Sequence, residues 1–534
     1  MLFLMGASTG AAYAVSNPGI TDVKIAQQDG ACTGIVKDAT GETVIGASVV
    51  VKGTTNGTIT GIDGDFSLSN VKKGDVIVIS FVGYISQEIV WDGKPVNVTL
   101  KDDTQTLDEV VVVGYGTQKK VNVTGAVGMV DSKVIAARPV QNVSQALQGV
   151  IPGLNLTVGN SGGSLDGEMN INIRGTGTIG DGSGSSPLVL IDGIEGNLNT
   201  VNPNDIESVS VLKDAASASI YGARASFGVI LVTTKSGKSG KTNVNYSGNV
   251  RFNDAIGIPE LMDSYTFAQY FNRASSNRGG GDIFSPAVME RIKAYQEGTL
   301  TATTVDNGSG IWQKWANANG NTDWFGEFYD NWVPSQEHNL SISGGTEKLQ
   351  YVLSGSFLDQ KGLLRHGTDK FQRYTLNSKI TANITDWLKV TLNSKWTRED
   401  FQRPTYLTSS FFHNLARKWP VHPAYDPNGF PMDEGEIEQM ENGGEQNSQK
   451  DYYTNQLHVV IEPIKNWRIN LEGSVRTTTQ YQHWEVLPVH AYDVNGDPYY
   501  TVWDMGYGSY SAGSSRVDEY SWKENYYTCL LYTS

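Results

Sequence analysis

The chain has 534 residues and a formal net charge of −15, and it is rich in glycine, tyrosine and tryptophan, with 59, 25 and 12 residues. At roughly 100–200 residues per domain, this length predicts three or four domains. The acidic balance, with no basic cluster to oppose it, argues against a nucleic-acid partner. Abundant glycine and aromatic residues favour strands joined by tight turns over a helical enzyme, so we expect a mainly β protein.

Residues 1–14 are interpreted as a partial signal peptide. An apolar run at 1–5 is followed by the small-x-small site Ala12-Tyr13-Ala14, which is typical of the end of a secretory signal. The basic segment that opens such signals is missing, so we expect the natural start to lie upstream. No later run of 18 or more apolar residues could form a transmembrane helix.

Cysteine usage excludes a disulfide framework, because Cys32 and Cys529 are the only two cysteines. Lipid attachment at Cys32 would need an apolar residue where Asp29 stands. A small buried thiol is therefore the better interpretation of Cys32.

Residues 32–101 predict a small antiparallel β-sandwich. Apolar and polar residues alternate over 47–52, and a core strand follows at 76–81. Asn56-Gly57 and Asp63-Gly64 are hairpin-turn dipeptides that separate the strands.

Three segments of this region, 46–49, 58–67 and 81–84, resemble the carboxypeptidase-regulatory-like domain. The resemblance implies a sandwich without catalytic function. Asp63 and Asp65 could begin a calcium loop, but the ligand spacing of such loops does not continue. A turn with solvated carboxylates is the better interpretation.

A valine-rich segment at 107–116 follows the sandwich and has polar flanks on both sides. Four consecutive valines favour extended backbone. Such a segment can add as a strand to the exposed sheet edge of another protein, or it can be a buried strand of a neighbouring domain. Its residues are Leu107, Asp108, Glu109, Val110, Val111, Val112, Val113, Gly114, Tyr115 and Gly116.

Residues 117–237 predict a compact α+β domain. A short helix at 144–150 ends at Pro152-Gly153, and the expected strands follow at 169–174, 187–193, 205–214 and 227–235. The run 175–180 matches the dinucleotide fingerprint, which requires a helix immediately afterwards. Residues 181–187 cannot form that helix, so we interpret the run as a flexible glycine loop.

From residue 241 to 528, polar and apolar residues alternate strictly over paired segments of about ten residues, such as 349–357, 388–396 and 468–476. This is the length of a tilted membrane-spanning β-strand, although a soluble sandwich would show the same period of two. The connections between segments decide between these alternatives.

Short and long connections alternate along this region. Tight turns occur at 344–347, 385–387 and 463–466, whereas long connections occupy 254–335, 401–450 and 483–516, with a shorter one at 359–369. Short turns on one rim and long loops on the other are typical of an outer-membrane barrel. Aromatic residues expected at the membrane boundary are Tyr374, Trp387, Trp396, Tyr452, Tyr453 and Trp467.

The ordered motifs of the chain resemble the SusC-like TonB-dependent outer-membrane transporters. In the plug they are Leu147-Gln148-Gly149, Ile173-Arg174-Gly175, Leu190-Ile191-Asp192-Gly193, the run 206–215, and Ile220-Tyr221-Gly222-Ala223-Arg224-Ala225. In the barrel they are Asp323-Trp324-Phe325, the run 338–345 and the run 351–362.

This resemblance implies that 107–116 is a TonB box, 117–237 a plug and 241–528 the first part of a large barrel. The plug residues it points to are Arg174, Gly175, Asp192, Gly193, Tyr221, Gly222 and Arg224. It also implies TonB, a SusD-like surface lipoprotein and outer-membrane lipid as partners, and oligosaccharides or peptides as cargo. A siderophore or haem receptor is the alternative, and a surface adhesin is a third possibility that the plug motifs disfavour.

About eight strands are expected after residue 241, fewer than the ~22 of such a barrel, so we expect the sequence to be a fragment. Residues 529–534 break the alternation before them and are interpreted as a non-native tail. Seven histidines are scattered without metal-site spacing, and no nucleophile motif occurs, so we expect neither cofactor nor catalysis. Sugars stack on aromatic faces, but tryptophans in or near long loops more often belong to an aromatic girdle or a loop core, so we assign none of them to cargo binding: Trp312, Trp315, Trp324, Trp332, Trp419, Trp484 and Trp503.

Overall fold

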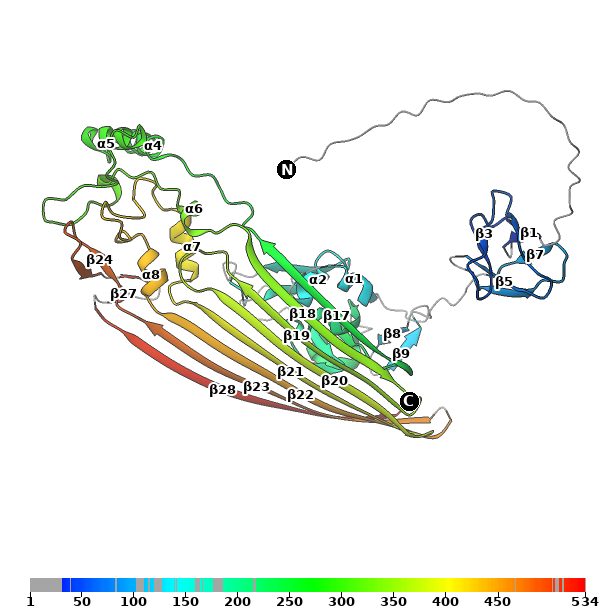
Figure 1. Cartoon of the computed structure of the whole chain (residues 1–534). Coiled ribbons are helices and arrows are strands. Elements are labelled where there is room, and N and C mark those ends of the chain that lie inside the picture. Colours follow the sequence, from blue (N-terminus) through cyan, green and yellow to red (C-terminus); the bar gives the residue numbers. More distant parts are fainter. Residues whose placement is uncertain are drawn as a thin grey trace, which may run out of the picture. The chain divides into compact units, whose positions relative to one another are not determined.

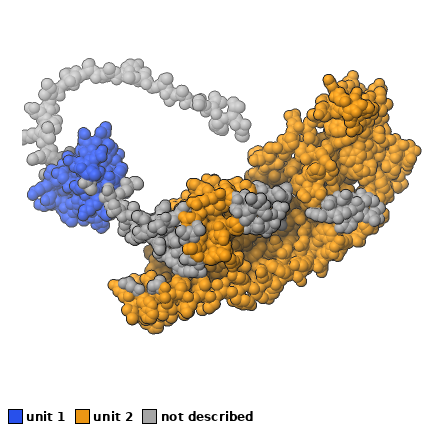
Figure 2. Space-filling view, turned by 180° about the vertical axis from the view of Figure 1, so that it is seen from behind, with its two compact units in different colours: residues 1–109 blue, residues 110–534 orange. Residues whose placement is uncertain are grey.

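The computed structural model forms two compact units, residues 1–109 and residues 110–534, which are coloured separately in Figure 2. The signal peptide expected at 1–14 lies outside the described residues. The structure describes residues 31–101, 110–113, 116–119, 127–158, 164–175, 186–214, 218–501, 503–504, 509–510 and 513–533, except positions 39, 82, 83, 139, 141, 166 and 466.

Unit 1 is a sandwich of two small sheets, with strand orders β4-β1-β7 and β3-β2-β5-β6. Side chains of β1 alternate between buried and exposed, as the period of two requires. Cys32 is fully buried in the core between the sheets, which confirms the interpretation of a buried thiol. The strands are β1 (Cys32–Lys37), β2 (Ser48–Val51), β3 (Gly57–Ile59), β4 (Asp65–Leu68), β5 (Val76–Ser80), β6 (Gln87–Val90) and β7 (Val96–Thr99).

Unit 2 begins with a two-stranded hairpin in which β8 (Val110–Val113) pairs with β9 (Gly116–Lys119). The predicted plug follows, built on a five-stranded sheet with the order β10-β15-β16-β13-β14. Its apolar core includes the fully buried Ile135, Val143, Leu147 and Val209. The remaining helices and strands of this part are β10 (Val127–Asp131), α1 (Ser132–Ala136), α2 (Val143–Leu147), β11 (Leu154–Val158), β12 (Met169–Ile173), β13 (Leu188–Ile191), β14 (Ile194–Glu195), η2 (Leu198–Thr200), η3 (Pro203–Asp205), β15 (Ile206–Leu212), η4 (Ser219–Ala225) and β16 (Val229–Thr234).

The third part is one curved sheet of eight antiparallel strands in sequence order, here called the wall (Figure 1). The number of strands agrees with the prediction, but each has 13–20 residues where about ten were expected. The strands are β17 (Gly240–Asn253), β18 (Val333–Gly345), β19 (Leu349–Lys361), β20 (Lys370–Thr385), β21 (Leu388–Pro404), β22 (Glu445–Ile464), β23 (Trp467–Val486) and β28 (Arg516–Thr533).

Short turns join the wall strands at one rim, and long loops gather at the other rim, as Figure 1 shows. The loops pack on one another through an apolar core in which Trp324, Phe328 and Phe411 are fully buried. Their elements are α4 (Ser264–Asn277), α5 (Pro286–Gln296), η5 (Trp315–Asn317), α6 (Trp324–Phe328), α7 (Ser409–Ala416), α8 (Ile437–Asn442), β24 (His490–Tyr492), β25 (Pro498–Tyr500), β26 (Trp503–Asp504) and β27 (Ser509–Tyr510).

The two faces of the wall have different chemistry. Asn393 and Gln456 bond to the plug, so their face is the inner one. Leu376, Leu392 and Leu457 are 57%, 47% and 48% exposed and belong to the opposite, outer face. The predicted alternation of facing is therefore confirmed for these strands.

One sequence expectation for the wall is corrected. Tyr452 lines a cavity between wall and plug, so it belongs to the inner face and not to an outer aromatic belt. Its neighbour Tyr453 pairs with Trp396 on the outer face, and adjacent residues of a strand cannot share a face. Residues 529–533 continue the last strand, because β28 pairs with β23 through Thr533, and the interpretation of 529–534 as a non-native tail stays a prediction.

Within the described part of the chain, every helix is too short or too polar to cross a membrane.

Candidate functional site

The site lies where a turn of the plug meets the inner face of the wall. Strand β13 ends at Ile191, and β14 begins at Ile194, so Asp192 and Gly193 form a two-residue turn. Both have positive φ, 50° and 88°, a conformation that glycine adopts easily and that aspartate tolerates better than most residues. This turn directs the Asp192 carboxylate out of the plug sheet.

The Asp192 carboxylate is held first by the plug itself. The backbone N–H of Thr234, at the end of β16, donates to Oδ1 over 2.9 Å, and its hydroxyl donates to Oδ2 over 2.7 Å. Because β13 and β16 are parallel neighbours, their ends lie side by side and fix the carboxylate.

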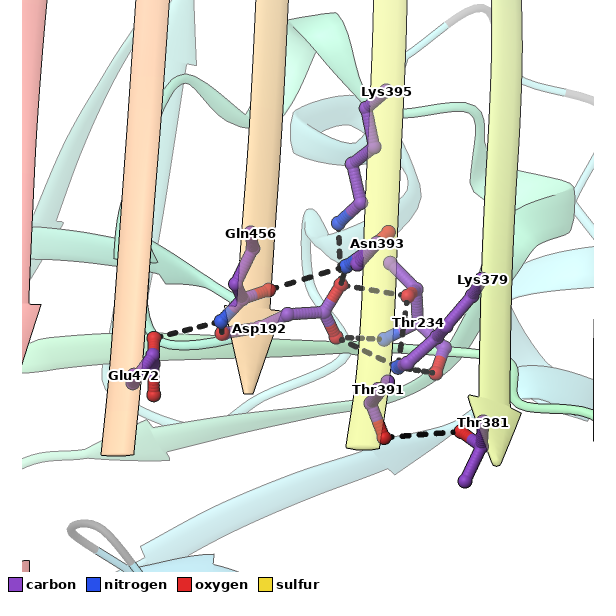
Figure 3. Close-up of polar contacts among 9 residues, drawn as sticks. All are labelled: Asp192, Thr234, Lys379, Thr381, Thr391, Asn393, Lys395, Gln456 and Glu472. Atoms are coloured by element: carbon purple, nitrogen blue, oxygen red, sulfur yellow. Dashed lines mark hydrogen bonds and ion pairs between the residues drawn. The ribbon is translucent and has the colours of Figure 1, made fainter. Parts of the chain in front are cut away.

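Wall strands β20, β21 and β22 complete the coordination, as Figure 3 shows. Lys379 Nζ lies 3.5 Å from Oδ1, Lys395 Nζ contacts Oδ2, and Asn393 Nδ2 donates to Oδ2 over 3.1 Å. Gln456 Nε2 donates to the backbone carbonyl of Asp192 over 2.9 Å. We call these residues, Asp192, Thr234, Lys379, Asn393, Lys395 and Gln456, the Asp192 cluster.

Electrostatics favour an ionised Asp192 in this cluster. Its side chain is only 7% exposed, and burial alone would raise the pKa of the carboxyl group. The charges of Lys395 and Lys379, with hydrogen bonds from Lys395 and from the Thr234 backbone, instead hold the pKa well below its ordinary value. The carboxylate is therefore a fixed negative charge that binds the plug to the wall.

Further polar contacts join plug and wall away from the cluster. Arg373 donates to the carbonyl of Asn199 over 2.6 Å, and Thr397 donates to that of Thr200 over 3.0 Å. Asn202 donates to the Asn339 side chain over 2.7 Å, in a buried contact. The plug is thus held at several heights along the wall.

A cavity of about 390 Å³ separates plug and wall beside the Asp192 cluster. Its lining combines plug residues such as Asn197 and Asp205 with wall residues such as Lys450, Thr478 and Gln480. Burial raises the pKa of the Asp205 carboxyl group, against an opposing hydrogen bond from Ser354. The cavity is lined by both polar and apolar residues, such as Ile191 and Val201.

The residues that the resemblance singled out are only partly brought together. Asp192 lies in the cluster, Gly193 approaches Glu472 of the wall, and Arg224 contacts Glu195 and the Tyr526 hydroxyl. Arg174 and Gly175 lie apart, at the end of β12, where the Arg174 backbone N–H donates to the backbone carbonyl of Gly153. Tyr221 and Gly222 lie in η4, and Tyr221 packs against an apolar cluster of the plug.

The valine-rich segment is described only in part. Val110, Val111, Val112 and Val113 form β8, and Gly116 begins β9. Leu107, Asp108, Glu109, Gly114 and Tyr115 lie outside the described residues. The extended conformation expected for the four valines is observed.

The tryptophans of the long loops differ in accessibility. Trp324 is fully buried, so it is part of the loop core and cannot contact cargo there. Trp332 is 70% exposed. Trp312, Trp315, Trp419 and Trp484 are half-buried, and the side chain of Trp503 lies outside the described residues. Within the described ranges, no group of three or more histidine, cysteine or acidic side chains is placed to hold a metal ion.

The wall residues of the Asp192 cluster were not singled out from the sequence. Lys389, Asn393 and Lys395 were visible as a polar face of an alternating strand, and that pattern was the only signal. Their meeting with Asp192 depends on the register of three strands, which the pattern does not give.

Residues 119–229 match the TonB-dependent Receptor Plug Domain family, and residues 32–112 match the CarboxypepD_reg-like domain family. The chain is 37% identical over 375 residues to the TonB-dependent receptor SusC of Bacteroides thetaiotaomicron, across 68% of this chain and 33% of SusC. A TonB-dependent receptor of Formosa agariphila is 33% identical over 393 residues, across 73% of this chain and 34% of that protein. The chain therefore carries the plug domain of the TonB-dependent receptors and is similar to their SusC-like members.

A solved structure shows a similar fold. The RagAB peptide importer in its open-open state is similar with a TM-score of 0.57 and 25% identity, across 71% of this chain and 43% of that chain. The receptor spans about a third of the length of the curated relatives it matches. Those relatives are receptors rather than enzymes, in agreement with the expectation of no catalysis.

Proposed function

We propose that this SusC-like receptor takes part in TonB-dependent import of oligosaccharides or peptides across the outer membrane. The observation that carries the proposal is the Asp192 cluster, which binds a plug with its own apolar core to the inner face of the wall. A plug that is held by polar contacts can be displaced from the wall and can return to it. An apolar core inside the wall could not be displaced in this way. Transport then requires a force that acts on the plug.

The segment 107–116 is the proposed point of attachment for that force. It precedes the plug directly, and Val110–Val113 already has strand conformation. Backbone groups of a strand can pair with the sheet edge of a partner such as TonB. The partner would bring energy from the inner membrane, where each charge yields about 2.3 kcal/mol per 100 mV.

The other partners follow from the same proposal. The N-terminal sandwich and the short-turn rim would face the periplasm, and the packed loops would face the exterior, where a SusD-like lipoprotein would cover them. Outer-membrane lipid would contact the exposed leucines of the outer face. The siderophore or haem alternative shares the plug and the wall, but the carboxypeptidase-regulatory-like domain favours the SusC-like assignment.

Deletion of residues 107–116 in the natural host tests the proposal. We expect cargo uptake to be lost while cargo still binds to cells, because the deletion removes the attachment point and leaves the wall and loops intact. Uptake that survives the deletion would contradict the role given to the segment.

A matched pair of substitutions separates backbone pairing from a general loss of fold. Val112→Pro removes an N–H and blocks strand pairing, whereas Val112→Thr keeps a β-branched side chain and the backbone groups. We expect uptake to fall strongly in the first variant and to remain near the natural level in the second.

A further inference from the structure

The outer face of the wall carries a pocket that is lined mostly by polar residues. The pocket has a volume of about 350 Å³ and lies across β20, β21, β22 and β23. Two lining residues, Phe401 and Tyr481, are aromatic, and the others are polar: Lys370, Gln372, Asp400, Gln402, Asn447, Ser448 and Gln449. We call it the outer-wall pocket.

Strand register places the polar side chains of the pocket on the outer face. Gln372, Asp400, Gln449 and Tyr481 are direct neighbours in one cross-strand row. The row lies two positions along each strand from the row that contains Tyr374, and four positions from the row of Leu376, which is 57% exposed. Side chains separated by two or four residues share a face.

The same face contains an apolar band closer to the short-turn rim. Exposed side chains of this band include Leu392, Leu457 and Leu471. Trp396 and Tyr453 close the band on the side of the pocket, with ring centroids 6.4 Å apart. The Trp396 indole N–H donates to Asp451 over 2.9 Å, so its polar edge is turned towards the loops. Aromatic residues with one polar edge are typical of the membrane boundary.

The height of the pocket above this boundary restricts what can reach it. Asp400 and Gln402 follow Trp396 by four and six residues, which is about 13–20 Å along the strand and about 10–15 Å after a tilt of roughly 40°. The polar layer of a bilayer is only about 5–8 Å thick on each side. A phospholipid headgroup therefore ends below the pocket, whereas a chain of several sugars reaches it.

The charge of the pocket opposes a phosphate ligand. Lys370 is the one cation of the lining, and it already lies 3.4 Å from Asp359. Gln449 donates to Asp400 over 3.0 Å, Gln402 donates to Glu445 over 2.7 Å, and Tyr481 donates to Glu519 over 3.2 Å. Carboxylates and amide oxygens that surround the pocket are acceptors for hydroxyl groups.

We propose that the outer-wall pocket binds the neutral oligosaccharide headgroup of a glycolipid in the outer leaflet. The proposal rests on the outer-membrane location given under the proposed function, but not on import. Acyl chains of the lipid lie against the apolar band, and its sugars donate hydroxyl groups to the carboxylates and amides of the pocket. The receptor thereby holds a lipid at one place on its wall.

The test uses the receptor purified from its natural outer membrane and placed in phosphatidylethanolamine nanodiscs. The probe is a diacylglycerol with a neutral trisaccharide head, and native mass spectrometry counts bound probe. In the double variant Gln372→Ala/Gln449→Ala we expect the probe to bind about tenfold more weakly, because two neutral hydrogen bonds to its sugars are lost. Gln336→Ala is the control. Gln336 is opposite Asp359, which is opposite Gln372, so it belongs to the same cross-strand row but does not line the pocket. Probe binding should not change in this variant.

Two further ligands, compared with the probe, distinguish the proposed glycolipid from a free sugar and from a phosphorylated lipid. We expect the free trisaccharide and the same lipid with a phosphorylated head to bind more weakly than the probe. Equal binding of the free sugar, tighter binding of the phosphorylated lipid, or unchanged binding in the double variant would overturn the proposal. A change of oligomeric state in the double variant would overturn it too, because the face would then be a contact between copies.

A second variant guards against a misfolded wall. Tyr481→Phe removes one hydroxyl group from the lining and should weaken probe binding severalfold. Cargo uptake by the same variants is measured separately. Normal cargo uptake together with weakened probe binding in these variants supports the glycolipid site at the outer-wall pocket. Loss of uptake in the 107–116 deletion alone tests the proposed import function and not the pocket.

Discussion

Asp192 of the plug and Lys379 of the wall lie 3.5 Å apart, although 187 positions separate them in the sequence. Lys395 contacts the other oxygen of the same carboxylate, so one plug residue forms ion pairs with two wall lysines that are 14% and 19% exposed. The plug turn and the wall therefore depend on each other: without Asp192, two ammonium groups would remain in a poorly hydrated interface.

Asp192→Ala should loosen the plug on the wall. Removal of one member of a buried ionic group costs roughly 3–5 kcal/mol, because its partners keep their charges without compensation. Hydrogen exchange of the plug in isolated outer membranes should rise in this variant. The additional replacement Lys395→Met should recover part of the loss, as a coupled pair requires. Unchanged exchange in Asp192→Ala would show that the other plug–wall contacts suffice.

Much of the wall could be predicted from the sequence. The alternation of polar and apolar residues shows which side chains share a face of a strand, even when the neighbouring strands are not known. Leu353, Leu392 and Leu471 occupy the outer face as expected, and the tight turns fall at the predicted positions. The prediction failed for Tyr452, which we expected on the outer face and which lies on the inner face. A shift of one residue along a strand moves a side chain to the opposite face.

The composition of the Asp192 cluster could not be predicted. Asp192 and Gln456 are 264 positions apart, and each wall strand offers several inward polar residues. Which of them meets the turn depends on strand register and on how the plug sits against the wall. The turn itself was visible in Asp192-Gly193, but its partners were not.

A disulfide between β10 and β15 should block transport. The chain that leaves the valine-rich segment enters the plug at β10, an edge strand that pairs with β15, whereas β13 and β16 are held at the Asp192 cluster. Tension on the segment therefore acts first on the β10–β15 pair. Met129 and Ser210 are opposite each other in that pair, a spacing within reach of a disulfide.

Met129→Cys/Ser210→Cys should lose cargo uptake when oxidised and regain it with a reductant. The matched control is Ser356→Cys/Thr375→Cys, whose native hydroxyl groups lie 2.5 Å apart within the wall. Because the wall does not have to open, this control should transport in both redox states. Full uptake by the oxidised plug variant would mean that β10 remains on β15 during transport.

Gly237→Ala should disturb the chain between plug and wall. Gly237 lies between β16 and β17, and a Cβ atom there would lie 2.4 Å from the backbone N and 2.6 Å from the backbone O of Tyr351. Neither backbone atom can move without distorting β19, so we expect a loss of roughly 1–3 kcal/mol, as for an overpacked core. Gly473→Ala is the control, because no atom lies within 4 Å of its added Cβ. Thermal unfolding of the two variants in outer-membrane preparations gives the comparison.

The packed loops should lose stability in acid through His422. This imidazole is fully buried: Nε2 donates to the carbonyl of Asp433 over 3.1 Å, and Nδ1 accepts the N–H of Trp315 over 3.4 Å. Both ring nitrogens are used by the neutral form, so a second proton has no acceptor. Burial, with the nearby charges of Lys418 and Lys314, lowers the pKa of His422 to about 3.

The direction of the effect follows from proton binding in the two states. Unfolded loops bind a proton at His422 below its ordinary pKa of about 6.5, whereas folded loops do not bind it until about pH 3. Loop stability is therefore complete above pH 6.5 and decreases as the pH falls towards 3, by about 2 kcal/mol at pH 5. Hydrogen exchange of residues 405–444 at pH 7.5 and pH 5 measures this loss. His422→Gln cannot titrate, so its loops should respond less to the same pH change; an equal response would assign the acid sensitivity to other groups, such as Glu434 beside Lys314.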